Sequence, residues 1–128
     1  MKNYLLDRHT LLWFLNGDDT LSKPAKDILR DIENTIFVSI ASLWEIGIKM
    51  SIGKLKLAYS LEEIVENMQL QNIQVLAIQP LHIIKMTTLP FHHRDPFDRI
   101  IIAQAITEKM KLISRDGEFK KYECDLIW

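Results

Sequence analysis

The stretch DPFDRIIIAQAITEKMKLISRDG, residues 95–117, contains the signals that decide the fold. Asp95 followed by Pro96 predicts the start of a helix. Residues 100–110 are apolar nearly all round, which is typical of a helix buried against a sheet. Residues 112 and 113 then predict a short strand that ends at the turn signal Asp116-Gly117. A buried helix followed by a strand is a building unit of an α/β sheet.

Strand-like and helix-like segments alternate in the same way along the rest of the chain. We expect strands at residues 4–6, 36–38, 73–78 and, as a last edge strand, 126–128. Helices are expected at residues 10–15, 22–34 with Ile32 on the apolar face, 39–52 or 42–52, 60–72 and from 80 onward. Because parallel neighbours need crossover helices, this order predicts a single domain over residues 1–128, an α/β/α sandwich with four or five mostly parallel strands.

The overall composition limits the classes of function. The chain has 128 residues, 48% of them hydrophobic and 26% charged, with a formal net charge of −1. These values fit one globular domain and argue against a broadly basic nucleic-acid coat. The single Cys124 allows no internal disulfide, and residues 7–9 interrupt the apolar region that a signal peptide requires. No apolar stretch approaches the roughly 20 residues of a membrane span, so we expect a cytoplasmic protein.

Four carboxylates stand just after predicted strands or on the helices that follow them: Asp7, Glu45, Asp98 and Asp116. The carboxyl ends of parallel strands share one edge of a sheet, so these acids are expected to meet in one pocket. Two carboxylates about 4 Å apart oppose each other by roughly 4 kcal/mol at an effective dielectric near 20. Four of them need protons or divalent cations, and the pattern therefore predicts a metal site with Mg²⁺ or Mn²⁺, which prefer oxygen ligands.

Each acid also has a structural interpretation. Asp7 is a candidate helix cap, and Asp116 before Gly117 is a candidate turn residue. Glu45 completes a capping-box pattern with Ser42 and also stands one helical turn before Lys49. A shared metal site explains all of these positions with one assumption.

Asp98 and Asp95, near the start of the same predicted helix, have different expected roles. Asp98 lies on the same helical stripe as Ile101 and Ile102, so its carboxylate is expected to be partly buried and to need a cation, a proton or several hydrogen-bond donors. Asp95 precedes Pro96 and is expected mainly to cap the helix, with an auxiliary role in the site.

Several motifs resemble those of one enzyme family over essentially the full length of the chain. They are LLDRHTLLW at residues 5–13, SLWEI at 42–46, DPFDR at 95–99 with IAQA at 102–105, and SRD at 114–116. These motifs, in this order, resemble the PIN-domain ribonucleases and, more narrowly, the VapC-type toxins of bacterial toxin–antitoxin pairs.

The resemblance implies a Mg²⁺- or Mn²⁺-dependent endoribonuclease, restrained by an antitoxin protein and commonly a homodimer. It implies catalytic roles for Asp7, Glu45, Asp98 and Asp116. Asp7 and Asp98 are the first choices for direct metal ligands, while Glu45 and Asp116 are expected to bind directly, to bind through water or to position the nucleophile. Ser114, Asp95 and Arg8 are auxiliary candidates.

The residues that hold the RNA are a separate expectation. Cations near the acidic edge are candidates for phosphate binding, namely Lys49, Arg94, Arg99 and Arg115. His92 and His93 are expected to be ordinary exposed loop residues rather than a proton-transfer pair. Trp13, Trp44 and Phe97 are expected to pack in the core rather than to stack on bases.

Arg8 departs from the family pattern, which usually has a small hydroxyl residue after the first Asp. A guanidinium here either pairs with Asp7 and weakens the metal site or points outward and grips RNA. The first case makes the chain a catalytically weak or inactive PIN-like module that binds RNA or an antitoxin. A phosphoacceptor receiver domain is a third and remote reading, because paired acids after the first strand and a lysine after the last are missing.

Overall fold

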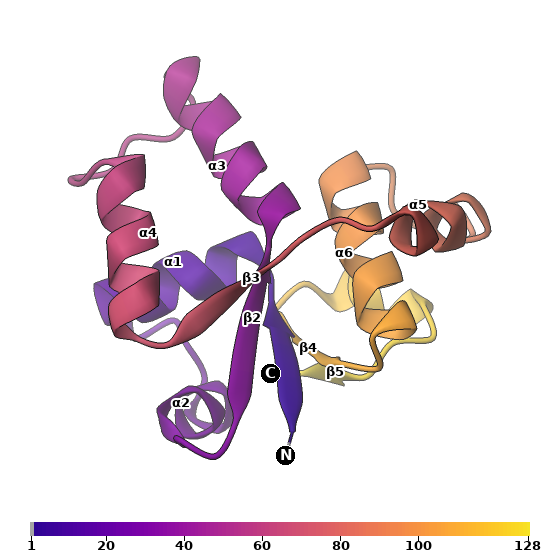
Figure 1. Cartoon of the computed structure of the whole chain (residues 1–128), viewed down its shortest axis with the longest axis horizontal. Helices are drawn as coiled ribbons and strands as arrows, with labels where there is room; N and C mark the ends of the chain where they lie inside the picture. The colour runs from indigo at the N-terminus through magenta and orange to yellow at the C-terminus, as the bar shows by residue number, and fades with distance from the viewer. Residues whose placement is uncertain (1) are drawn as a thin grey trace.

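Parallel strands form one sheet in the computed structural model, which describes residues 2–128. Within this range there are five strands, β1 (Asn3–Leu6), β2 (Thr35–Ser39), β3 (Ile73–Leu76), β4 (Lys111–Ile113) and β5 (Leu126–Ile127). Their order is β3-β2-β1-β4-β5, and every neighbouring pair is parallel (Figure 1). The predicted α/β fold is confirmed, and the sheet has five strands where four or five were expected.

The winding of the sheet reverses beside its central strand. From β1 the chain moves outward through β2 to β3, and it then crosses to the other side of β1 to add β4 and β5. In open parallel sheets such a reversal leaves a crevice at the carboxyl ends of the strands, where ligands bind. The carboxyl ends of β1 and β4 border that crevice here.

Helices cover both faces of the sheet. They are α1 (Arg8–Asn16), α2 (Lys23–Arg30), α3 (Ile40–Ser51), α4 (Leu61–Leu70), α5 (Pro80–Thr87) and α6 (Pro96–Thr107), with a 3₁₀ helix, η1, at Gly117–Lys121. Figure 1 shows α1, α2 and α4 on one face and α5 and α6 on the other, while α3 rises from the end of β2. This arrangement confirms the predicted α/β/α sandwich.

The pleat of the strands divides the core into two clusters. Leu6 of β1 packs with Leu11 of α1 on one face, whereas Leu5 packs with Ile101 of α6 on the other. Successive strand side chains point to opposite faces, so a strand buried on both sides has a continuous apolar sequence. This explains why residues 4–6 lack an alternating pattern.

Most helix starts agree with the sequence. Asp95 accepts hydrogen bonds from the backbone N–H groups of Phe97 and Asp98, and Ser60 and Glu63 form the expected capping box. Of the two cap candidates for α3, Ser39 is the cap, since it accepts from the N–H of Ala41. Ser42 is buried inside the helix, so the capping box with Glu45 is wrong.

Several helices and strands end earlier in the structure than the sequence predicted. The helix expected to reach residue 34 ends at Arg30, and Ile32 is 93% exposed rather than on an apolar face. The helix expected to reach residue 110 ends at Thr107, because Lys109 adopts a left-handed conformation with φ of 55°. Strand β3 ends at Leu76, opposite the last residue of β2. Within residues 2–128 we find no helix with the length and apolarity needed to cross a membrane.

Candidate metal centre

All four predicted acids line one cavity of about 210 Å³ at the carboxyl edge of the sheet. Asp7 follows β1, Glu45 lies on α3, Asp98 lies in the first turn of α6, and Asp116 follows β4. The other residues that line the cavity are Arg8, His9, Lys49 and Asp95. Chain segments more than 100 residues apart therefore supply one group of carboxylates, as expected at a topological switch point.

Asp7 is buried and held at both carboxylate oxygens. One oxygen accepts a hydrogen bond from the N–H of Thr10 at 2.9 Å and thereby caps α1. The other accepts from the hydroxyl of Ser114 at 2.5 Å. The same hydroxyl accepts from the N–H of Asp116 at 3.0 Å, so Ser114 links the two acids. Asp7 therefore both caps α1 and lines the cavity, because the cavity lies at the N-terminus of this helix.

His93 bridges Asp98 and Asp116. Its Nε2 atom is 3.1 Å from Oδ2 of Asp98 and 3.4 Å from Oδ2 of Asp116. The N–H of Asp95 points to Nδ1 of the ring at 3.4 Å, which assigns the proton to Nε2 in the neutral form. One ligand atom from each of the three residues lies within 4.8 Å of the others, so this group is also a geometrically suitable metal-binding set.

The pKa of Asp98 is raised to about 7. Burial is the largest cause, and the negative charge of Asp95 adds to it, while His93 opposes the shift. Glu45 and Asp7 raise the pKa further. The described residues therefore leave the ionised form of Asp98 poorly compensated, and a divalent cation is the kind of group that would balance it.

Glu45 is surrounded by cations of the chain itself. Its Oε2 atom is 3.0 Å from the ammonium of Lys49 and 3.7 Å from the guanidinium of Arg8. The other terminal nitrogen of Arg8 lies 2.9 Å from Nε2 of His9. Burial, followed by the charge of Arg8, lowers the pKa of His9 and favours a neutral ring that can accept from the guanidinium.

The position of Arg8 corrects the partner expected for it and its outward orientation, and leaves the weakened metal site as a hypothesis. Its side chain is only 15% exposed, so it does not point outward, and its ion pair is with Glu45 rather than with Asp7. The guanidinium thus enters the cavity and neutralises one carboxylate, while Asp7 keeps its hydrogen bond with Ser114.

Arg99 has a structural environment. Its guanidinium donates hydrogen bonds to the carbonyl oxygens of Met86, Leu89, Pro90 and His93, and the residue is 6% exposed. It therefore holds the loop before α6 and does not fit the RNA-binding role expected for it. Arg94 and Arg115 are exposed, and Lys49 is partly exposed and paired with Glu45. These three remain candidates for phosphate contacts.

Two residues differ from the sequence-based interpretation. His93 is not an ordinary exposed loop residue, because it contacts two of the acids. Its place two residues before the helix cap Asp95 puts it near the crevice, but this position alone does not predict the contacts with the two acids. Trp44 is 62% exposed and not in the core, and its ring contacts Phe97 of α6, while Glu45 faces the cavity.

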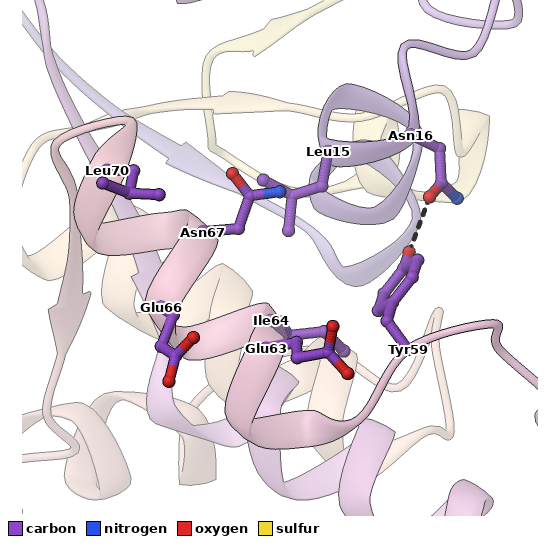
Figure 2. Close-up of a pocket in the computed structure, with 8 residues that line it drawn as sticks. All are labelled: Leu15, Asn16, Tyr59, Glu63, Ile64, Glu66, Asn67 and Leu70. Atoms are coloured by element: carbon purple, nitrogen blue, oxygen red, sulfur yellow. Dashed lines mark hydrogen bonds between the residues drawn. The ribbon is translucent and has the colours of Figure 1, made fainter.

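A larger hollow of about 460 Å³ lies between α1 and α4 and contains none of the predicted site residues (Figure 2). The hydroxyl of Tyr59 donates to Oδ1 of Asn16 at 2.7 Å across one end of it. Of its two carboxylates, Glu63 caps α4 and Glu66 is exposed. The size of this hollow therefore does not make it the better candidate site.

The fold and the cavity define a class: a doubly wound α/β domain with a carboxylate centre at its switch point. The sequence pattern of the PIN domain matches residues 4–123, and the chain belongs to this family. Because the chain is a PIN domain, the receiver-domain alternative is wrong. Comparison with the sequences of curated proteins gives no match.

Several solved structures share this fold at low sequence identity, and one of them is a toxin–antitoxin complex from Klebsiella pneumoniae. VapBC2 from Rickettsia felis, bound to a DNA fragment from their promoter, has a chain with a TM-score of 0.70 and 18% identity, covering 98% of this chain and 97% of its own. A chain of DNA-bound VapBC from Salmonella typhimurium has a TM-score of 0.70 and 14% identity. The match covers 99% of this chain and 98% of that one. A chain of FitAcB from Neisseria gonorrhoeae has a TM-score of 0.68 and 16% identity. The match covers 98% of this chain and 96% of that one. At these identities the likeness shows the fold.

Proposed function

We propose that this PIN domain is a metal-dependent endoribonuclease and the toxin of a toxin–antitoxin pair. The observation that carries the proposal is the convergence of Asp7, Glu45, Asp98 and Asp116 on one cavity. Nuclease activity is the general function of PIN domains, which supports the catalytic assignment. The toxin–antitoxin complexes among the solved structures support an antitoxin partner.

In this proposal Asp7, Asp98 and Asp116 hold Mg²⁺ or Mn²⁺, and Glu45 binds directly, binds through water or positions the nucleophile. The donor set fits these ions, because carboxylate oxygens are the ligands they prefer. A bound ion supplies Lewis acidity and lowers the pKa of a water nucleophile. Ser114 keeps Asp7 oriented through its hydrogen bond, and the Nε2 proton of His93 holds Asp98 beside Asp116.

The substrate in this proposal is RNA, held by Lys49, Arg94 and Arg115 around the cavity. Exposed cations at the rim suit phosphate binding, because they position a nucleic-acid backbone without reading its sequence. An antitoxin protein that covers the cavity, a homodimeric state and a cytoplasmic location complete the proposal.

The direct test is incubation of the purified chain with total cellular RNA at increasing Mg²⁺ or Mn²⁺, with EDTA and single-stranded DNA as controls. We expect discrete RNA fragments that require the metal, and no fragments with EDTA. RNA that stays intact at saturating metal, confirmed by measured Mn²⁺ binding, would refute the nuclease assignment.

Metal affinity is expected to depend on pH through Asp98. Because the pKa of Asp98 is about 7, its proton competes with the metal below pH 7 and is lost above it. Raising the pH from 6 to 8 increases the ionised fraction about tenfold, so Mn²⁺ affinity should rise by a similar factor. Isothermal titration in two buffers of different ionisation enthalpy measures both the affinity and the proton released. Equal affinity at pH 6 and 8 would contradict the prediction.

The ion pair between Arg8 and Glu45 favours a second candidate, a weakly catalytic or inactive module. A unit charge about 5 Å from a divalent ion changes the energy of that ion by roughly 7 kcal/mol at an effective dielectric of 20. We therefore expect Arg8→Thr to bind Mn²⁺ at least tenfold more tightly and to cleave RNA faster, as measured by electron paramagnetic resonance of free Mn²⁺ and by fragment yield. Arg30→Thr is the control, because Arg30 is exposed in the last turn of α2 and is not part of the cavity lining. Equal affinity and equal cleavage by Arg8→Thr and the unaltered chain would reject this role.

A further inference from the structure

An aromatic pair joins the two helices that flank the carboxylate cavity. The ring of Trp44 on α3 meets the ring of Phe97 on α6 edge to face, with centroids 5.2 Å apart and planes at 85°. Phe97 is half-buried, whereas Trp44 is 62% exposed. The pair therefore fixes one edge of the indole and leaves much of the ring accessible to solvent.

The same two helices supply carboxylates to the cavity at the next position in sequence. Trp44 directly precedes Glu45, and Phe97 directly precedes Asp98. Consecutive Cα atoms are only about 3.8 Å apart. On both helices an aromatic residue is therefore the direct neighbour in sequence of a carboxylate that lines the cavity.

Cations alone offer limited attraction for a polyanion at this point. Arg8 and Lys49 are both engaged by Glu45, and the formal net charge of the chain is −1. An aromatic ring adds an attraction of another kind, because every base has a face that stacks on it regardless of charge. Such a contact is worth between about fivefold and 150-fold in affinity per base.

We propose that Trp44 is a stacking platform for one unpaired base beside the phosphodiester that enters the cavity. Phe97 is a positioning residue that holds the indole through the edge-to-face contact. The inference rests on the proposed ribonuclease function and deepens it, since it assigns the site a preference for single-stranded RNA. A base inside a duplex is already stacked on its neighbours and must be extruded before it reaches the indole.

The test measures binding of a fluorescent single-stranded RNA in Mg²⁺, with Asp98→Asn as the background so that the probe stays intact. Trp44→Ala is expected to weaken binding at least fivefold, and Trp44→Phe is expected to retain most of it. Ile52→Ala is the matched control, because Ile52 is a 58% exposed apolar residue at the far end of α3. It should bind as the background does.

A second arm identifies the base. An abasic nucleotide is moved through the RNA one position at a time. At one position it should weaken binding to the background protein as much as Trp44→Ala does, with no further loss when the two are combined. A duplex of the same sequence should show no effect of Trp44→Ala. Thermal unfolding of each variant separates a lost contact from a lost fold.

Binding by Trp44→Ala within twofold of the background, or an equal loss on duplex RNA, would overturn the platform and leave Trp44 as a contact for a protein partner. If the unaltered chain neither binds nor cleaves RNA, the ribonuclease proposal fails and the platform fails with it. The two failures can be told apart. If only the platform fails, the chain with Asp98 intact still cleaves single-stranded RNA.

Discussion

Asp98→Asn is expected to reduce RNA cleavage on the order of 100-fold or more while leaving the metal-free protein at least as stable as the unaltered chain. The amide has the shape of the carboxyl group and lacks the charge that a divalent cation needs. Because folding raises the pKa of Asp98 from its ordinary value of 3.8 to about 7, its ionisation costs stability progressively between about pH 4 and pH 7. The asparagine removes this cost at pH 8.

The measurement compares cleavage rates at saturating Mn²⁺ and urea unfolding at pH 8 without metal. Asp19→Asn serves as the control, since the Asp19 carboxylate is fully exposed and not part of the cavity lining. Cleavage that survives Asp98→Asn would remove Asp98 from the proposed ligand set. A large loss of metal-free stability would instead show that this carboxylate holds the fold.

Arg99→Met is expected to lower the free energy of unfolding by about 3 kcal/mol or more. The guanidinium donates to four backbone carbonyls between Met86 and His93, and methionine fills similar space without any donor. The buried acceptors among these carbonyls would lose their partners. The same loop carries His93, so the variant should also bind Mn²⁺ less tightly.

Urea unfolding monitored by circular dichroism measures this loss of stability. Arg30→Met is the matched control, because Arg30 is exposed in the last turn of α2 and should change the unfolding free energy by less than about 0.5 kcal/mol. An Arg99→Met protein as stable as the Arg30→Met protein would show that water replaces the guanidinium at no cost.

Signals that are local in the sequence predicted the fold well. The order of strands and helices, the caps at Asp95 and Ser60, and the parallel sheet all follow from apolar periodicity and punctuation. The ends of elements did not follow, because they depend on pairing and packing. Ile32 fits the helical stripe of its segment, yet α2 ends two residues earlier and leaves that side chain exposed.

The candidate site shows the same division. The four acids could be grouped from their places at strand ends and on the helices beyond them, because the topology brings these positions together. Where a long side chain points depends on partners that are distant in sequence. Arg8 turned to Glu45, Arg99 turned into the loop before α6, and His93 turned to Asp98, and no local pattern predicts these contacts.

The hydrogen bond from Ser114 to Asp7 joins positions 107 residues apart, and it has a consequence for the order of synthesis. Strand β1 leaves the ribosome long before Ser114 and Asp116, which follow only after more than 100 further residues have been added. Translation at about 5–20 residues per second delays them by several seconds or more. If the proposed activity is correct, the nascent chain stays harmless to the messenger being translated until its last strands have joined the sheet.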